Sequence, residues 1–359
     1  MKKSQNSFFA VKPEHLVSAV FIERPNRFLV RCCINGNIEE AFLPNPGRLR
    51  EILLPETELF VSVDGRNQKR KTRYTVVAAR RKGKPVLLHT HMSNSVVENL
   101  ILNRRIKGLE DWTVEKREAT FGNSRFDFLL KNGGRHLLLE VKSCTLFGER
   151  MAMFPDAPSL RGKKHVEELC GLSGQGYDAA VLFLVQSSAP EYFLPDFHTD
   201  PLFAEALYSS RERITVLPVT AEWSENLELS SGTGILEVPW HYYENRRSGE
   251  GCCIIIGIGT DNQTWVTVGC SMNINASMKK IAMEIKGASL FIPGTKPEFI
   301  PIRTDRRLKD EITENIALMS KEEISVEGHR FFLFEKSPWQ MAQFVEMIVY
   351  FRSDRILEV

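Results

Sequence analysis

Two short apolar runs separated by a polar turn constrain the fold of this chain most. Residues 126–130 form the first run and residues 137–143 the second, with Lys-Asn-Gly-Gly-Arg between them. Apolar runs of this length, bounded by glycine and polar residues, are typical of β-strands, and the Gly-Gly step is typical of a hairpin turn. The sequence therefore predicts two adjacent strands near the middle of the chain.

Three charged residues lie on these predicted strands. Asp127 is on the first strand, and Glu140 and Lys142 are two positions apart on the second. Side chains two positions apart on a strand share a face, so Glu140 and Lys142 point the same way while Val141 is buried on the opposite face. Asp127 can reach the face of Glu140 from the partner strand. Two carboxylates and a lysine on one patch of sheet are the skeleton of a PD-(D/E)xK nuclease site.

This set of residues suits metal-dependent cleavage of a phosphodiester. Mg²⁺, or Mn²⁺ in its place, prefers carboxylate, carbonyl and water oxygens, so we expect Asp127, Glu140 and the Val141 carbonyl as ligands. A metal-bound water would supply the nucleophile, and Lys142 would orient that water or stabilise the transition state. The simpler alternative is a surface aspartate beside a Glu-x-Lys cross-strand charge pair, which contributes at most about 1 kcal/mol.

Three further segments, at residues 44–49, 69–75 and 153–165, accompany this motif. With residues 125–128 and 140–143, they closely resemble the sugar fermentation stimulation protein (SfsA) family, in the order and spacing of that family. The resemblance extends over roughly residues 14–220. It implies an N-terminal OB-like barrel, a nuclease-like α/β domain, DNA binding and a role in regulating sugar (maltose) metabolism. The family pattern has threonine where this chain has Pro46, so a hydroxyl and a backbone donor are missing there.

The formal net charge of +2 conceals a strong asymmetry along the chain. Residues 1–112 hold 20 Lys and Arg against 11 Asp and Glu, a balance of +9, and the remainder has a balance of −7. Nine basic residues and no acidic residue lie between Arg66 and Lys84. Dense positive charge beside short strands favours nucleic-acid binding, because released counterions drive affinity. The alternative is a solvated loop that keeps the protein soluble.

Several residues are candidates for contact with nucleic acid. Tyr74 lies among the basic residues, where its ring would stack on a base. Arg161 and Lys164 open the helix predicted at residues 162–171, where backbone donors and positive charge favour a phosphate. The full set of expected nucleic-acid contacts is Arg48, Lys69, Arg70, Lys71, Arg73, Tyr74, Arg161 and Lys164.

Other polar residues near the motif have two interpretations each. Glu98, on the helix predicted before the hairpin, is either a further metal ligand, as in related nuclease folds, or an exposed carboxylate. His165 either contacts phosphate or is a satisfied structural histidine. Gln186 ends an apolar strand at the edge expected to face the site, and it resembles the polar residue of some resolvase-like nucleases. His89 and His91 have metal-like spacing but no third ligand, which favours a structural pair.

The chain divides into three predicted domains of mixed α/β class. Residues 1–84 show short alternating runs and turns typical of an OB-like barrel. Residues 85–223 alternate helices and strands in the order of a PD-(D/E)xK nuclease-like domain, with a helix near 95–105. After a predicted linker at 230–234, residues 235–359 form an additional C-terminal α/β domain without a recognisable motif. Partner binding, dimerisation into a homo-oligomer or substrate selection would all fit this domain.

The elements expected in the C-terminal domain alternate between strand and helix. The expected strands and helices lie at residues 252–258, 264–268, 276–286, 298–303, 308–319, 329–335 and 339–351.

Composition favours a soluble cytoplasmic protein. No apolar run approaches the roughly 18 residues of a membrane helix, and the first residues lack the apolar stretch of a signal peptide. The seven cysteines include no Cys-x-x-Cys pair, which indicates reduced thiols rather than a disulfide framework or a zinc site.

Two functions of different classes follow from these observations. In the first, the protein is a nuclease that holds DNA or RNA on its barrel and basic segment and cleaves it with Asp127, Glu140 and Lys142. In the second, it is a non-catalytic DNA-binding transcriptional regulator in which the nuclease site is vestigial. A sugar-metabolising enzyme is not favoured, since the motifs are basic and face phosphate, unlike the paired carboxylates of glycosidases.

Overall fold

The computed structural model shows a chain of mixed α/β class that divides into two compact units. The first unit comprises Met1–Asp196 and Leu202–Pro239, and the second comprises Phe197–Pro201 and Trp240–Val359. The predicted fold class is thereby confirmed. The structure describes residues 9–10, 16–63, 72–122, 124–197, 199–247, 251–258, 264–271, 309–326 and 328–335.

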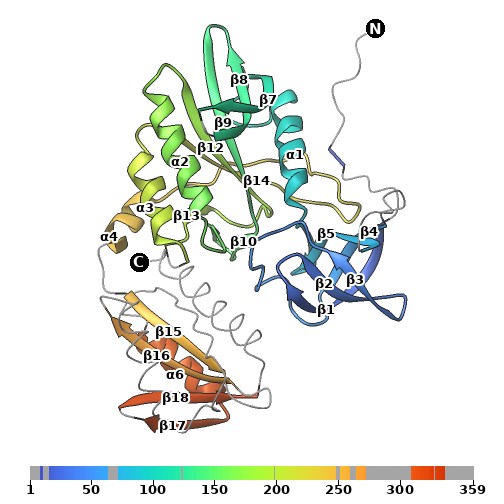
Figure 1. Ribbon diagram of the computed structural model, residues 1–359, viewed down its shortest axis with the longest axis vertical. Helices are drawn as coiled ribbons and strands as arrows, with labels where there is room; N and C mark the ends of the chain where they lie inside the picture. Colours follow the sequence, from blue (N-terminus) through green and yellow to red (C-terminus); the bar gives the residue numbers. More distant parts are fainter. Residues whose placement is uncertain are drawn as a thin grey trace. The chain divides into compact units, whose positions relative to one another are not determined.

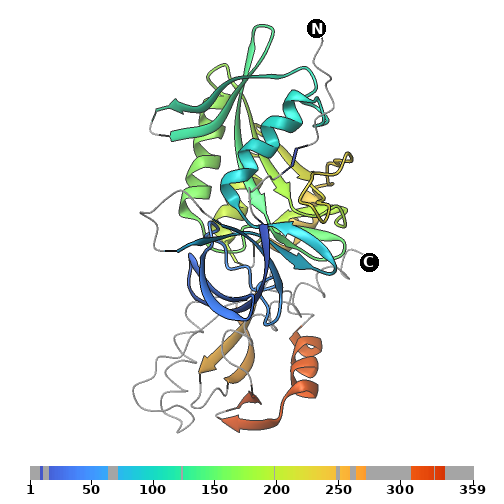
Figure 2. The same ribbon diagram turned by 90° about the vertical axis from the view of Figure 1, so that its right-hand side faces the viewer.

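The N-terminal strands of the first unit form a closed barrel, which Figure 2 shows nearly end-on. Their order is β3-β2-β1-β4-β5-β6, and parallel pairing of Ala41 with Tyr74 between β3 and β5 closes the sheet on itself. The OB-like barrel expected from the alternating runs is confirmed. Its strands are β1 (Leu16–Asn26), β2 (Leu29–Ile34), β3 (Asn37–Phe42), β4 (Glu58–Val63), β5 (Tyr74–Arg81) and β6 (Lys84–Leu87).

The barrel core follows from the period of two in its strands. On β2, Val30, Cys32 and Ile34 are buried, while the residues between them face outward. The tight turn from β2 to β3 places both Asn35 and Gly36 at positive φ, as a two-residue hairpin loop of this sequence requires.

A five-stranded sheet in the order β14-β12-β9-β8-β7 follows the barrel. The pair β8–β9 is the antiparallel hairpin expected from the two apolar runs, and β12 lies parallel to β9 on its other side. The strands are β7 (Thr113–Phe121), β8 (Ser124–Asn132), β9 (Arg135–Cys144), β12 (Asp178–Val185) and β14 (Thr215–Thr220). A small second sheet contains β10 (Leu146–Phe147), β11 (Met151–Phe154) and β13 (Tyr192–Pro195).

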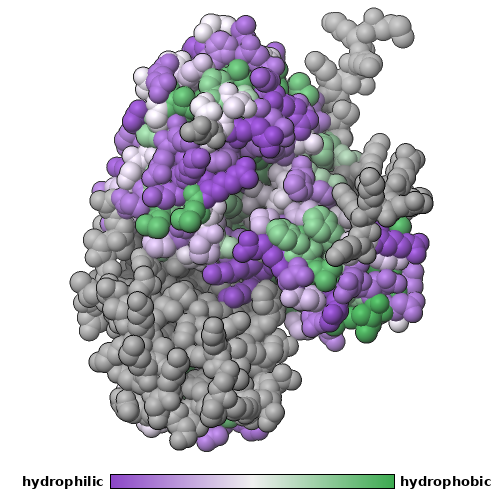
Figure 3. All heavy atoms as spheres, in the orientation of Figure 1, coloured by the Kyte–Doolittle hydropathy of each residue, from purple (hydrophilic) through white to green (hydrophobic). Residues whose placement is uncertain are grey.

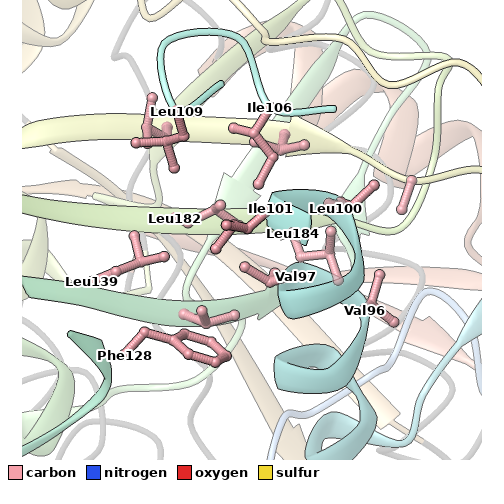
Figure 4. Packing of buried hydrophobic residues seen from close by; sticks show 14 of the residues in the cluster. Val96, Val97, Leu100, Ile101, Ile106, Leu109, Phe128, Leu139, Leu182 and Leu184 are labelled. Carbon is pink, nitrogen blue, oxygen red and sulfur yellow. The ribbon is translucent and has the colours of Figure 1, made fainter. Parts of the chain in front are cut away.

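Helices cover both faces of this sheet (Figure 1). On one face, α1 (Thr90–Leu102) directs Val97 and Ile101 toward Leu139 and Leu182 (Figure 4). The other face is covered by α2 (Leu160–Ser173) and α3 (Pro201–Ser210), where the rings of Phe183 and Phe203 meet edge to face. Burial on both faces explains why β12 is an uninterrupted apolar run.

The start of α1 differs from the expectation of a helix near 95–105. The helix begins at Thr90, whose backbone N–H and Oγ1 both donate to the Pro44 carbonyl, at 3.2 and 2.8 Å. A contact between segments more than 40 residues apart thus determines the helix start, and local sequence patterns do not contain that information.

The linker predicted at residues 230–234 is instead part of the first unit. The Gly234 amide donates to Thr220 Oγ1 at 2.7 Å, and Thr233 Oγ1 donates to the Arg105 carbonyl at 2.6 Å. The glycines and hydroxyls that are typical of linkers here pair with β14 and with the end of α1. The linker prediction is therefore wrong, and the first unit continues to Pro239.

The second unit contains an antiparallel sheet in the order β15-β16-β18-β17. Ile312 and Ile316, one turn apart on α6, are buried in this unit, as is Phe332 of β18. Expected elements at 276–286, 298–303 and 339–351 lie outside the described residues. The described elements are α4 (Trp240–Arg247), β15 (Gly251–Ile258), β16 (Thr264–Ser271), α6 (Lys309–Met319), β17 (Glu322–Val326) and β18 (His329–Phe334).

The described part of the chain contains no helix that is both long enough and apolar enough to cross a membrane. On the face shown in Figure 3, hydrophilic residues cover most of the described surface, and apolar residues gather only in small groups.

Within the first unit, one close contact joins the barrel to the part of the chain that contains the five-stranded sheet and its helices, called the sheet domain below. The carboxylate of Asp156, just after β11, accepts a hydrogen bond from the Leu49 amide at 3.2 Å. Arg24 reinforces this segment by donating to the carbonyls of Arg48 and Asn45, at 2.6 and 3.1 Å. A Cβ atom at Gly47 would lie 2.4 Å from Asp156 Oδ2, so only glycine fits there.

We predict that Gly47→Ala destabilises the first unit, because the added methyl group collides with the Asp156 carboxylate. The free energy of unfolding should fall by about 1–3 kcal/mol, the usual cost of overpacking. Urea unfolding followed by circular dichroism measures it. Gly134→Ala is the matched control, since a Cβ there meets nothing within 4 Å. Equal stability of the two variants would contradict the proposed contact.

Candidate active site

The structure brings Asp127, Glu140 and Lys142 together. Phe128 pairs with Leu139 across the β8–β9 hairpin, and the same register continued by one position puts Asp127 opposite Glu140. The Val141 amide donates to Asp127 Oδ2 at 2.7 Å, and Lys142 Nζ lies 2.5 Å from Glu140 Oε1. The three charged groups predicted from the hairpin therefore form one cluster.

Burial distinguishes this cluster from a surface charge pair. Glu140 is 4% exposed, and the Lys142 side chain is 15% exposed. Val141 packs into the apolar core on the opposite face, as expected from the strand alternation. Taking two charges out of water is costly unless they are paired. The alternative of an exposed cross-strand pair does not describe this geometry.

Helix α1 contributes Asn94, a residue that the sequence analysis missed. Asn94 Nδ2 donates to Asp127 Oδ1 at 2.7 Å, so hydrogen bonds hold both oxygens of that carboxylate. Glu98, four residues later, instead accepts from Arg117 Nη1 at 3.2 Å. Residues four apart on a helix share a face, so the placement of Glu98 near the site also implied Asn94. Glu98 as a metal ligand stays a prediction.

Helix α2 contributes His165, which holds Glu140 from the other side. His165 Nδ1 lies 2.6 Å from Glu140 Oε1, and Arg161 Nε lies 3.4 Å from His165 Nε2. Since Arg161 can only donate, Nε2 accepts and Nδ1 bears the proton given to Glu140. His165 is 5% exposed, which supports its structural interpretation over direct contact with phosphate.

The position of this histidine depends on the start of α2. Ser159 caps the helix, accepting a hydrogen bond from the Gly162 amide at 2.9 Å. Such a cap satisfies one of the free amides of the first turn. It places His165 two turns into the helix and over the Phe126 ring, with the ring centroids 6.1 Å apart.

One carboxylate oxygen of this cluster has no partner. Among the described residues, Glu140 Oε2 is buried and forms no hydrogen bond. Leaving a buried acceptor unsatisfied is costly, and a cation would relieve that cost. The described chain has no group of three His, Cys, Asp or Glu side chains arranged around a metal position. The expectation that Asp127, Glu140 and the Val141 carbonyl hold Mg²⁺ stays a prediction, and it needs water or other oxygens to complete the coordination.

The surroundings of the two carboxylates shift their pKa values in opposite directions. Burial and then the charge of Glu140 raise the pKa of Asp127, against the hydrogen bonds from Val141 and Asn94. Burial would also raise the pKa of Glu140, but Lys142 and His165 together outweigh it, and the pKa is lowered. Glu140 thus stabilises the fold above the ordinary glutamate range and loses this effect as pH falls. The Asp127 carboxyl contributes to stability in the opposite direction. Because its pKa is raised in the folded state, its ionisation destabilises the fold, and this destabilisation grows as pH rises through the raised pKa.

The residues expected to contact nucleic acid differ in where the structure places them. Lys69, Arg70 and Lys71 lie outside the described residues. Tyr74 is 8% exposed and belongs to the barrel core, so the base stacking expected of its ring is contradicted by its burial. The residues that follow it on β5, from Thr75 to Ala79, are buried as well. Arg73 lies over the Tyr74 ring, 5.5 Å from its centroid.

The remaining basic residues of that set lie at two places. The Arg48 carbonyl accepts from Arg24 within the segment that contacts Asp156. On α2, Lys164 is exposed and lies 3.7 Å from Glu168, while Arg161 reaches His165. Arg161 is thus the expected phosphate contact that lies beside the carboxylate cluster.

The C-terminal half of the basic run is paired with acidic residues. Arg80 forms ion pairs with Glu58 and Glu225, each at 2.7 Å. In the same hairpin, Lys82 lies 2.8 Å from Glu149, and Lys84 pairs with Glu222. The local absence of acidic residues in the sequence therefore did not mean an unpaired basic surface, because the partners come from distant segments.

Gln186 and the two histidines lie outside the carboxylate cluster's hydrogen bonds. Gln186 Oε1 accepts from Trp223 Nε1 at 2.8 Å, and the Gln186 amide donates to the Cys144 carbonyl at 2.9 Å. Gln186 therefore supports the end of β9. The rings of His89 and His91 meet edge to face, with centroids 5.8 Å apart.

Comparison with known proteins places the chain in a family. Residues 22–88 match the SfsA N-terminal OB domain, and residues 91–227 match the sugar fermentation stimulation protein RE domain. A sugar fermentation stimulation protein homolog of Methanothermobacter thermautotrophicus is 39% identical over 208 residues, covering 58% of this chain and 86% of that protein. The chain belongs to the sugar fermentation stimulation protein (SfsA) family.

Other members agree with this assignment. A homolog of Clostridium kluyveri is 42% identical over 216 residues, covering 59% of this chain and 93% of that protein. The structure of Pyrococcus furiosus SfsA in complex with Ca²⁺ is 29% identical and superposes with a TM-score of 0.59. That superposition covers 64% of this chain and 98% of the Pyrococcus chain. The family matches end at residue 227, so Trp240–Val359, which makes up most of the second unit of this SfsA-family chain, lies beyond them.

We predict that Asn94→Ala weakens binding of Mg²⁺ and Mn²⁺ by about 10- to 100-fold, the usual effect of removing a group that orients a metal ligand. The substitution removes a donor from Asp127 Oδ1 and raises the pKa of that carboxylate further. Calorimetric titration measures the affinity. Asn103→Ala, which removes a side-chain amide that donates to the Asn99 carbonyl in the last turn of α1, should leave the affinity unchanged. Equal cation affinity in wild type and Asn94→Ala would refute this role.

Proposed function

We propose that this protein binds nucleic acid and hydrolyses its phosphodiester bonds with a divalent metal held by Asp127 and Glu140, beside the ammonium group of Lys142. The observation that supports cleavage most is the buried, unpartnered Oε2 of Glu140 beside the carboxylate of Asp127. The structure of the Pyrococcus relative is a complex with Ca²⁺, so a relative holds a divalent cation. Mg²⁺ or Mn²⁺ is the metal proposed here, as their preference for oxygen ligands fits the donor set.

Each residue of the cluster has a separate task in this proposal. Asp127, Glu140 and the Val141 carbonyl hold the cation, which when bound activates water and offsets charge on the phosphate. Asn94 and His165 orient the two carboxylates from opposite faces of the sheet. Lys142 stabilises the negative charge that develops on the phosphate oxygens.

The proposed polymer is DNA or RNA. OB-like barrels commonly bind oligonucleotides, and the basic segment around residues 66–73 adjoins β5 of the barrel. Arg161 and Lys164 add positive charge at the start of α2, next to His165.

A non-catalytic DNA-binding regulator is the second candidate. Lys142 and His165 both lie against Glu140 Oε1, so the charge of this glutamate is offset without a metal. In that case the old nuclease site is a structural ion pair. A role in regulating sugar (maltose) metabolism would fit the name of the relatives, which are sugar fermentation stimulation protein homologs.

Two further proposals concern the setting of the protein. The described cysteines Cys32, Cys33, Cys144 and Cys170 are free thiols, which supports a cytoplasmic location. The second unit is proposed to mediate either self-association into a homo-oligomer or the choice of substrate.

Cleavage of labelled single-stranded, duplex and branched DNA and RNA with Mg²⁺ or Mn²⁺ separates the two candidates. We predict that Lys142→Ala lowers the cleavage rate by about 10²- to 10³-fold, because it removes a group that stabilises the developing charge. Glu140→Gln should also abolish cleavage, while binding is retained in both variants.

Lys131→Ala is the control for this experiment, since Lys131 is exposed on β8 near the hairpin turn. It should cleave as the wild type does. Binding without cleavage on every substrate would exclude the nuclease and leave the regulator.

Salt dependence tests the basic segment. We predict that replacing Lys69, Arg70, Lys71 and Arg73 with glutamine lowers the slope of log affinity against log salt by about 0.7 to 0.9 for each lost phosphate contact. Fluorescence anisotropy at several salt concentrations gives this slope. Arg135→Gln, which removes an exposed arginine paired with Asp178 at 2.9 Å, should leave the slope unchanged. A slope that does not respond to the quadruple substitution would exclude this segment as the binding surface.

A further inference from the structure

A cavity of about 220 Å³ lies within the first unit, where the β5–β6 hairpin of the barrel meets the sheet domain. Its lining includes none of the three charged residues of the candidate active site. The other walls come from three segments, at residues 147–149, 186–189 and 222–223. The cavity thus needs both domains of the unit to exist.

The walls of this cavity are mainly apolar and aromatic. Phe147, Val86 and Trp223 line it, and the Arg81 guanidinium lies 4.3 Å from the centroid of the Phe147 ring. Trp223 donates to the buried amide of Gln186 at 2.8 Å, which fixes the floor. A pocket of apolar walls with a few placed polar groups is the usual form of a small-molecule site.

The mouth of the cavity is charged. Lys82 lies 2.8 Å from Glu149, and Lys84 pairs with Glu222, so each lysine of the barrel hairpin meets a carboxylate of the sheet domain. Ser188 Oγ also donates to Glu222 at 2.6 Å. Both lysines are exposed, and exposed ion pairs contribute little to stability. An anion with several oxygens can therefore replace the two carboxylates at the lysines.

The floor of the cavity is joined to the strand that contains the active-site residues. The Gln186 amide donates to the Cys144 carbonyl at 2.9 Å, and Gln186 Nε2 lies 3.4 Å from Ser143 Oγ. Ser143 directly follows Lys142 on β9. The floor of the cavity is therefore hydrogen-bonded to the two residues that follow Lys142 on β9.

We propose that this cavity binds a single unpaired nucleotide, with the base inside and the phosphate at Lys82 and Lys84. The base is planar and fits walls formed by Phe147 and Trp223, while its polar edge meets the hydroxyls of the 187–188 segment. The volume is below the 300–1,000 Å³ of pockets for drug-sized ligands, and a single base is a ligand of correspondingly small size.

The bound nucleotide would be either a free mononucleotide or one unstacked nucleotide within a polynucleotide. In the second case the proposal rests on the proposed function, and it implies a preference for single-stranded substrate near the candidate active site. In the first case it is independent of cleavage and of polymer binding.

Titration of the full-length protein with AMP, GMP, CMP and UMP in EDTA, followed by calorimetry, tests the free source. Anisotropy with a fluorescein-labelled 12-nucleotide single strand, also in EDTA, tests the polymer source. Ala189→Trp fills the cavity from an exposed position, and Lys82→Gln with Lys84→Gln removes the phosphate partners. Both changes should lower affinity at least about 10-fold, because the first blocks the place of the base and the second removes the partners of the phosphate.

Substitution of the two carboxylates at the mouth of the cavity should change the nucleotide affinity in the opposite direction. Glu149→Gln with Glu222→Gln removes the competing anions and should tighten binding, an effect that structural damage would not produce. Lys131→Gln is the charge control, and the thermal midpoint of each variant confirms folding. Glu140→Gln should leave nucleotide binding unchanged even where it abolishes cleavage, which separates this proposal from the proposed function.

Mononucleotide binding that responds to these variants as expected supports a free nucleotide as the ligand. A response confined to the 12-nucleotide strand supports an unpaired position of a polymer. If neither probe responds to Ala189→Trp or to the two double variants in folded protein, the cavity does not bind a nucleotide and the proposal is wrong.

Discussion

The burial of one glutamate organises the centre of this protein. Glu140 lies inside the sheet domain, with Lys142 and His165 on one carboxylate oxygen and, among the described residues, no hydrogen bond on the other. A buried carboxylate is tolerated only where positive charge or donors surround it. Helix α2 must therefore place its histidine over β9, and the strand must direct its lysine to the same face. The vacant acceptor that results is what makes a cation an attractive partner.

Contacts between distant segments keep this arrangement in place. Asn94 reaches Asp127 from α1, and Thr90 at the start of that helix donates to the Pro44 carbonyl in the segment that follows β3. Asp156 fits against Gly47 of the same segment. The barrel is therefore more than an attached binding module, since it helps to determine the geometry of the carboxylate cluster. The ion pairs of the β5–β6 hairpin add to this connection and form the mouth of a cavity.

Much of the fold and the centre of the site could be predicted from short-range patterns. The hairpin that contains Asp127 and Glu140 has a period of two and a glycine turn, and both signals are local. The contributions of Asn94 and His165 depend on how helices pack on the sheet, so their roles were missed or left open. Tyr74 was misjudged because its charged neighbours concealed a position that faces the barrel core. The C-terminal half of the basic run was misjudged because the acidic partners of Arg80, Lys82 and Lys84 are far away in sequence.

The sequence by itself determined the strands, their alternation and the three charged residues of the motif, because strand periodicity and turn chemistry act over a few residues. It also determined the charge asymmetry between the N-terminal part and the remainder. Only the tertiary structure decided which oxygen of Glu140 is satisfied, which helix residue orients Asp127 and which lysines are paired. Those outcomes depend on side chains more than 20 residues apart that meet in a low-dielectric interior, where burial and pairing set their energies.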